Sequence, residues 1–222
     1  WSSDVCSSDL DPFASPSAVS VLKPIAETGL PGWALDDTES SVATRDFLAR
    51  VCARSIDAVA KGHRGSGKGG LVDIDRPGQE VIERSAVTVE GDQLRVRCYV
   101  GLPAHGRRIA GRDAKAMLID ELPHIVDRAL EYDRERHTGL EDHVHGYRDA
   151  EALRRILSER GWVTFIADGS ILPRRSGVDA RPMARDEAVR FESPGSLRRT
   201  VELPHAGEVS GMAVPAGVTV IC

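Results

Sequence analysis

The chain has 222 residues, of which 41% are hydrophobic and 28% are charged, and its formal net charge is −5. These values are typical of an ordinary globular protein and do not indicate a globally basic nucleic-acid binder, although they allow a local basic patch. No apolar run approaches the ~20 residues that a membrane-spanning helix requires. The four cysteines form no C-x-x-C pair, so we expect Cys52 and Cys98 to be buried free thiols in a reducing cytoplasm.

The N-terminal quarter is predicted to hold one edge strand and one helix. Residues 1–10 have neither a basic start nor a continuous apolar stretch, so they are not a signal peptide. They are similar to translated sequencing-adapter DNA, and we exclude them from the fold. Prolines surround the apolar stretch 19–22, which suits an edge strand. Thr44 is a plausible N-cap of a helix for which Gly62 supplies the C′ residue. The apolar positions of this helix are Phe47, Leu48, Val51, Cys52, Ile56 and Val59.

Strands and a second helical region follow. Residues 71–74 and 80–89 are rich in Val and Ile, and Gly-Asp at 91–92 is a hairpin signal. Residues 94–100 alternate between apolar and polar or aromatic side chains, which predicts a strand with one buried face. Residues 113–132 have a helical pattern that the proline at position 123 should kink or divide.

The C-terminal part is predicted to be mostly β. Residues 137–147 are polar and read as a loop, and Asp149 can cap a helix that runs to Gly161. A Pro-Ala-Gly turn at 215–217 precedes a short apolar strand at 218–222. The other strands are expected at 162–167, 188–192, 197–203 and 208–214. This order of elements predicts a mixed α/β (α+β) fold.

The most glycine-dense stretch, residues 62–69, spells G-x-x-x-x-G-K but departs from a phosphate-binding P-loop. Gly69 stands where a P-loop needs a Ser or Thr hydroxyl for Mg²⁺. A helix is also predicted before the stretch and a strand after it, the reverse of the P-loop context. Two interpretations stay open. Arg64, Ser66 and Lys68 can form an anion-binding nest with the glycine amides, or the stretch is a flexible solvated loop.

A second loop, residues 101–111, lies between a buried strand and a helix. Arg107, Arg108 and Arg112 can clamp phosphates because guanidinium groups match phosphate geometry. The alternative is a structural turn whose arginines pair with acids such as Asp113.

A third loop, residues 168–177, follows the predicted strand 162–167. Asp168 can bind Mg²⁺ or orient another group, and Arg174 and Arg175 can contact phosphate. The alternative is a turn whose aspartate caps backbone amides. The loop does not match a Walker B motif. The histidines between 137 and 145 fit no strong zinc pattern, and no nucleophile–base constellation is evident, so we assign no metal ligands and no catalytic residues.

Six separated segments, in this order, make the chain resemble the predicted ATPases of the ABC class. They are DPFASP (11–16), RGSGKGG (64–70), GQEVIER (78–84), GLPAHGRR (101–108), ADGSILPRRSG (167–177) and GMAVPAGVT (211–219). The resemblance implies an N-terminal domain at 11–190 and the first strands of an ATP-binding cassette at 191–222. It also implies ATP and Mg²⁺ as cofactors, a homodimer and a cytoplasmic location.

In the family, the final turn and strand lead into G-x-x-x-x-G-K-[ST], which we expect beyond residue 222. The 222-residue chain is therefore expected not to hydrolyse ATP alone. The alternative is a module that binds RNA or another single strand, with the three basic loops lining a groove. A third hypothesis is a scaffold that only holds an ATPase dimer together.

Overall fold

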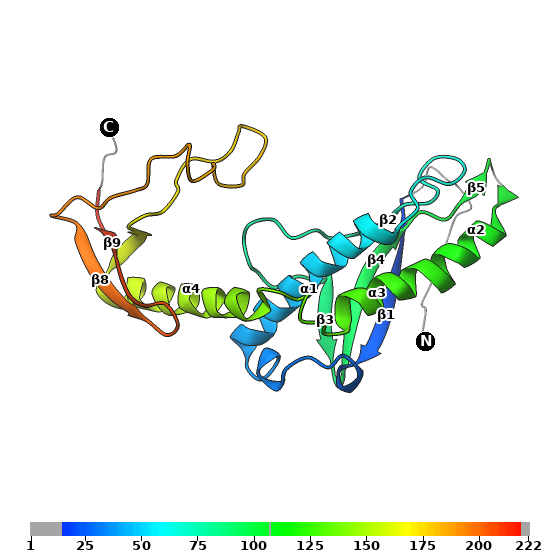
Figure 1. Cartoon of the computed structure of the whole chain (residues 1–222), viewed down its shortest axis with the longest axis horizontal. Coiled ribbons are helices and arrows are strands. Elements are labelled where there is room, and N and C mark those ends of the chain that lie inside the picture. Colours follow the sequence, from blue (N-terminus) through cyan, green and yellow to red (C-terminus); the bar gives the residue numbers. More distant parts are fainter. Residues whose placement is uncertain (1–14, 107, 219–222) are drawn as a thin grey trace. The chain divides into compact units, whose positions relative to one another are not determined.

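The computed structural model describes residues 15–106 and 108–218, which form two compact units (Figure 1). Unit 1 ends at Leu140 and unit 2 begins at Glu141. The mixed α/β class is confirmed. The division lies 50 residues before the boundary expected at 190/191, because strand pairing joins residues 162–167 to residues 207–215 in one body. The predicted strand at 218–222 lies outside the described residues except for Val218.

Unit 1 contains an antiparallel sheet in which every strand pairs with one central strand, β4 (Gln93–Val100). β1 (Ser17–Pro24) pairs along the whole of β4 and forms one edge, as the sequence predicted. On the other side, β2 (Val72–Ile74) and β3 (Val87–Glu90) pair with successive parts of β4. The predicted strand at 80–89 is therefore wrong over 80–86, which has no strand structure.

Helices α1 (Thr38–Val59) and α3 (Leu122–Leu130) pack against each other and against the sheet (Figure 1). The side chain of Asp37 accepts a hydrogen bond from Ser40 N at 2.8 Å and caps α1, so the prediction that Thr44 is the N-cap was wrong. Thr44 lies inside the helix and is fully buried. Short 3-10 turns, η1 (Ile25–Glu27) and η2 (Gly32–Ala34), link β1 to α1.

The predicted helix at 113–132 is divided, as its proline suggested. It consists of α2 (Gly111–Lys115), the π-helical segment η3 (Ala116–Glu121) and α3, which has Pro123 at its start. A proline has no backbone N–H to donate to the preceding turn, which accounts for a change of hydrogen-bond pattern here.

Alternate residues of the sheet and one stripe of each helix form the core of unit 1. Cys52 and Cys98 are buried free thiols, as predicted. A hydrogen bond to Cys52, together with burial, raises the pKa of the Cys98 thiol, which keeps the thiol protonated. The buried strand residues of this core include Val19, Val21, Val72, Ile74, Val87, Leu94, Val96 and Val100.

The irregular segment at 75–86 is held on α1 by ion pairs. Asp46, whose side chain is fully buried on α1, lies 2.7 Å from Arg50 and 3.8 Å from Arg84. Arg84 also pairs with Glu80, and Arg45 pairs with Glu83. Charge pairing therefore replaces strand pairing over this segment.

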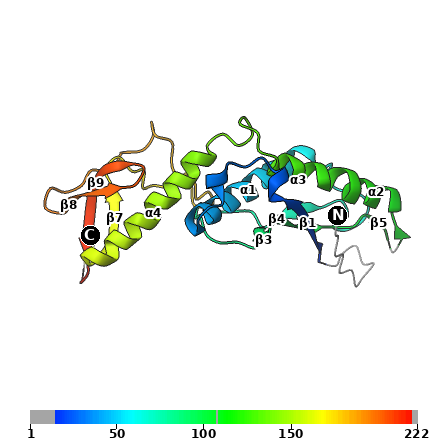
Figure 2. The ribbon, with the colours of Figure 1, turned by 90° about the horizontal axis from the view of Figure 1, so that it is seen from below.

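Unit 2 is a three-stranded antiparallel sheet with helix α4 (Leu140–Arg160) packed beside it (Figure 2). The strands are β7 (Trp162–Ala167), β8 (Arg198–Leu203) and β9 (Gly207–Pro215), with β9 central. A small core joins the helix to the sheet. It consists of Ala152, Val201 and Leu203, with Leu153, Ile156, Trp162, Phe165 and Val209 against it. No strand forms at 188–192, contrary to prediction.

The predicted loop at 137–147 is largely helical, because α4 begins at Leu140. His137, expected in a solvated loop, is 2% exposed and its Nε2 lies 2.9 Å from Ala129 O. Asp149 lies inside α4 and does not cap it. Its carboxylate accepts hydrogen bonds from the backbone N–H groups of His205 and Ala206, at 2.9 and 2.8 Å. This contact fixes the β8–β9 turn on α4.

We expect Asp149→Ala to release the β8–β9 turn from α4. Two backbone N–H groups lose a carboxylate acceptor, which costs about 1–2 kcal/mol where water can replace part of the contact. Hydrogen–deuterium exchange should show faster exchange at His205 and Ala206. Glu159→Ala, an exposed change on the same helix, is the control and should leave this exchange unaltered. Equal exchange in both variants would contradict the contact.

Candidate functional site

The structure brings two of the three predicted loops together in unit 1. Ser66 N donates to Ala104 O at 2.7 Å, and Gly70 N donates to Gly101 O at 2.9 Å. The Ser66 hydroxyl accepts a hydrogen bond from Gly106 N at 3.2 Å. We call residues 62–71 and 101–106 the paired loops. Ser66 therefore binds one loop to the other, a role that the sequence did not suggest.

Glycines allow the paired loops to approach backbone to backbone. A Cβ at Gly101 would lie 1.9 Å from Lys68 O, and a Cβ at Gly65 would lie 2.3 Å from Ala104 O. Gly70 has φ +92°, a conformation that favours glycine. The glycine-rich stretch thus has a fixed structure over these residues, which disfavours the flexible-loop interpretation.

Arg64 points to a buried carboxylate in unit 1. Its guanidinium lies 2.5 Å from Glu121 Oε1, and the Arg64 and Glu121 side chains are only 12% and 7% exposed. Lys61 approaches the same carboxylate at 3.5 Å. Because Glu121 neutralises Arg64, this arginine anchors the glycine stretch to η3. The sequence analysis did not identify Glu121, because nothing in the local sequence distinguishes it from its acidic neighbour Asp120.

A pocket of about 510 Å³ lies beside the glycine stretch, with Lys68 on its wall. Its other walls are the last turn of α1 and the start of β2. Arg76 lines it too and is held by Asp57 at 2.8 Å and Asp73 at 2.9 Å. The hydrogen bond from Arg76 lowers the pKa of the Asp57 carboxyl. In the described part of the chain Lys68 has no ion-pair partner, so it is the cation available to an anion here.

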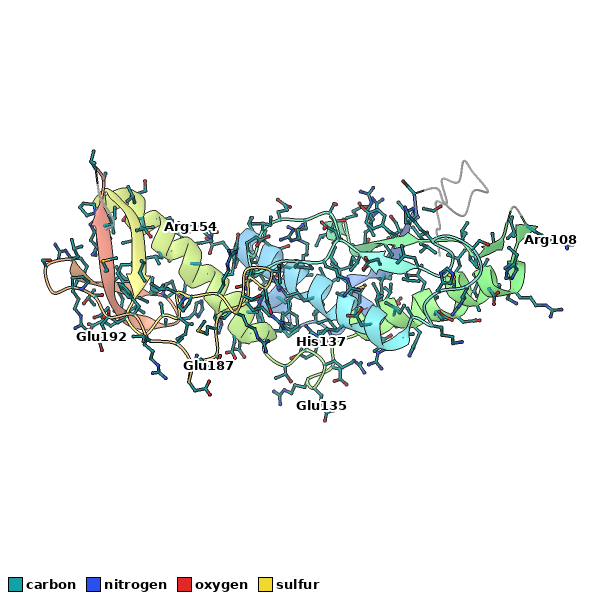
Figure 3. The ribbon with its side chains drawn as sticks, turned by 90° about the horizontal axis from the view of Figure 1, so that it is seen from above. Arg108, Glu135, His137, Arg154, Glu187 and Glu192 are labelled. Atoms are coloured by element: carbon teal, nitrogen blue, oxygen red, sulfur yellow. The ribbon has the colours of Figure 1, made fainter. Side chains whose placement is uncertain are left out.

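Two further candidate arginines lie near the paired loops in the chain. β5 (Ala104–His105) and β6 (Arg108–Ile109) form a small hairpin, and Figure 3 shows Arg108 at this end of unit 1. Arg108 and Arg112 are exposed, and neither forms an ion pair with any residue that the structure describes. Arg107 lies outside the described residues. The prediction that these arginines contact phosphate stays a prediction.

The third loop belongs to unit 2, and its aspartate is occupied by protein groups. Asp168 Oδ1 accepts hydrogen bonds from Ser193 N at 2.7 Å and from the Ser193 hydroxyl at 2.5 Å. Asp168 Oδ2 lies 3.1 Å from Arg198. The pKa of the Asp168 carboxyl is lowered, mainly by the hydrogen bond from the Ser193 hydroxyl. The geometry favours the structural interpretation of this residue.

Arg174 and Arg175 are exposed on the same loop. Arg174 forms an isolated bridge with Pro182, and Arg175 N donates to Arg181 O at 2.7 Å. Their backbones are therefore fixed by the segment at 181–182, while the side chains face solvent. Phosphate contacts by these two residues also stay a prediction.

Comparisons with protein-family models match almost the whole chain. A model described as "ATPase of the ABC class N-terminal" matches residues 6–133, which is more than half of the chain. A model described as "P-loop domain" matches residues 136–222. The junction between the two matches lies close to the division between the two compact units. A search of curated proteins found no match.

Proposed function

Because the chain belongs to the ABC-class ATPases, we propose that it acts as the N-terminal part of an enzyme that binds and hydrolyses ATP with Mg²⁺. The observation that carries this proposal is the pair of consecutive matches, an N-terminal domain followed directly by a P-loop domain. In such enzymes, positioning and charge neutralisation of the β- and γ-phosphates supply most of the catalysis.

The glycine stretch of unit 1 does not fit the catalytic Mg²⁺–ATP site. Gly69 carries no hydroxyl for the metal ion, and the stretch follows α1 and precedes β2. Arg64 is neutralised by Glu121. These residues are therefore not proposed to take part in hydrolysis, and we expect ATP turnover to need residues outside the 222 present here.

ATP turnover of the 222-residue chain, compared with that of the product of the whole gene, tests this proposal. We expect turnover from the whole product and none above background from the 222-residue chain. Lys68→Ala in the whole product should leave kcat within about twofold, because Lys68 is not proposed to hold the reacting phosphates. Turnover by the 222-residue chain that Lys68→Ala abolishes would instead place the catalytic site in the glycine stretch.

The proposal includes a homodimer in the cytoplasm. Buried free thiols at Cys52 and Cys98 suit a reducing compartment. Within the described residues, no helix combines the length and the hydropathy that crossing a membrane requires. Sedimentation of the whole product with and without ATP measures the oligomeric state.

Nucleic-acid binding is a second candidate function, favoured by cations at and near the paired loops. Lys68, Arg108 and Arg112 are exposed and unpaired among the described residues, although the chain as a whole is acidic. Binding through these cations should weaken steeply as salt rises.

A further inference from the structure

Within the described part of unit 1, helices cover one face of the sheet and leave the other face without a helix. Figure 1 shows α1 and α3 beside this sheet, and both contact its strands. The buried valines of the sheet lie on the side of these helices. Side chains alternate along a strand, so the residues between these valines lie on the opposite face. On the central strand, β4, these are Arg95, Arg97 and Tyr99. We call this surface the open face.

The open face presents an aromatic ring and a cation two positions apart on its central strand. Tyr99 is 37% exposed, and Arg97 is exposed and forms no ion pair with any described residue. Arg95, by contrast, is held 2.9 Å from Glu90. Small side chains lie beside them, because Ala18 is opposite Tyr99 and Ser20 is opposite Arg97 on β1. No large side chain of β1 therefore lies directly opposite the ring or the guanidinium.

The other neighbour of Tyr99 is Asp73 on β2, an acid that would repel a phosphate if it were free. Arg76 binds the Asp73 carboxylate at 2.9 Å and also binds Asp57. This ion pair reduces the negative charge beside the ring. The open face is therefore positively charged at Arg97, on its central strand.

We propose that the open face binds single-stranded nucleic acid, with a base stacked on Tyr99 and a phosphate at Arg97. An exposed aromatic ring on a sheet, next to an arginine, is the arrangement with which proteins stack unpaired bases. A duplex keeps its base faces hidden, so it cannot use Tyr99 in this way. β4 runs from Tyr99 directly into Gly101 of the paired loops, where Lys68 is exposed. The open face thus extends the second candidate function, on which this inference rests, and does not depend on ATP.

Fluorescence anisotropy of a labelled 12-nucleotide RNA, and of the same sequence as DNA, tests the inference on the 222-residue chain. We expect Tyr99→Ala and Arg97→Glu each to weaken binding at least fivefold, the usual effect of losing one stacked base or one phosphate contact. Tyr99→Phe keeps the ring and should bind within twofold of the unchanged protein. Arg134→Glu, the same charge reversal at an exposed arginine in the loop after α3, is the matched control.

A loop variant, in which Lys68, Arg108 and Arg112 are all changed to Glu, separates the open face from the candidate loops. Loss of binding in both sets of variants supports one continuous path across the open face and the loops. Loss in the loop variant alone overturns the open face and leaves the loops as the site. Absence of binding to either strand at low salt overturns both, and tight binding to duplex with no effect of Tyr99→Ala overturns stacking. Equal thermal unfolding of the variants shows that any loss is local.

Discussion

Gly101→Ala is expected to destabilise unit 1 by about 3 kcal/mol, the upper range for forcing an extra methyl group into a packed site. The new Cβ would lie 1.9 Å from Lys68 O and 2.8 Å from Lys68 C, both backbone atoms. Backbone cannot rotate away as a side-chain tip can, so the paired loops must separate. Their separation breaks the hydrogen bonds from Gly70 N and Gly101 N. Urea unfolding should show a lower midpoint with an unchanged slope.

Gly111→Ala is the matched control for this change. Gly111 begins α2, its φ is not positive, and a Cβ there meets no atom within 4 Å. Alanine suits a helix better than glycine, so the control should be neutral or slightly stabilising. If both variants unfold at the same urea concentration, the close approach of the paired loops is refuted.

Asp46→Ala is expected to cost about 3 kcal/mol, because it leaves two partly buried arginines without their shared carboxylate. The Asp46 side chain is 0% exposed, whereas Arg50 and Arg84 are 25% and 15% exposed. Water can reach the arginines in part, which places the expected cost at the lower end for a broken buried ion pair. Urea unfolding measures it, and proteolysis within residues 75–86 should become faster.

Glu83→Ala provides the comparison for a surface ion pair on the same segment. Glu83 is 73% exposed in its pair with Arg45, so its loss should cost less than ~0.5 kcal/mol. A cost of Asp46→Ala as small as that of Glu83→Ala would mean that the buried carboxylate does not hold the segment.

Local patterns predicted the elements that carry a strong period. The alternation along 94–100 and the apolar stripe of α1 both became buried faces in the structure. The start of α4 was missed because Leu140 and Val144 are the only apolar residues in its first turns. Tertiary burial of these two side chains, at 2% and 1% exposure, outweighs the polar sequence around them. Conversely, residues 188–192 form no strand, and Val189 is 91% exposed, so its apolar side chain is not buried against a sheet.

Contacts between distant segments could not be predicted from single motifs. The glycine stretch and the loop at 101–108 were each recognised as candidate sites, but no local pattern says that Ser66 meets Gly106. The pairing of Arg64 with Glu121 likewise joins residues 57 positions apart. For the candidate site, the sequence therefore indicated which residues could bind an anion. It did not indicate which of these side chains are neutralised by another residue of the protein, as Arg64 is by Glu121.

The arrangement of the unit 1 sheet constrains how the chain can fold during synthesis. Among the described residues, β1, β2 and β3 pair only with β4, and the paired residues of β1 and β4 lie 69 (93 − 24) to 83 (100 − 17) positions apart. Ribosomes add on the order of 10 residues per second, so β4 is synthesised several seconds after β1. During that time the valines of β1 have no sheet to bury them, and Lys23 and Pro24 at its end are residue types that discourage pairing with other chains. The β3–β4 hairpin closes over a two-residue turn, and loop-closure entropy favours its formation before β1 docks.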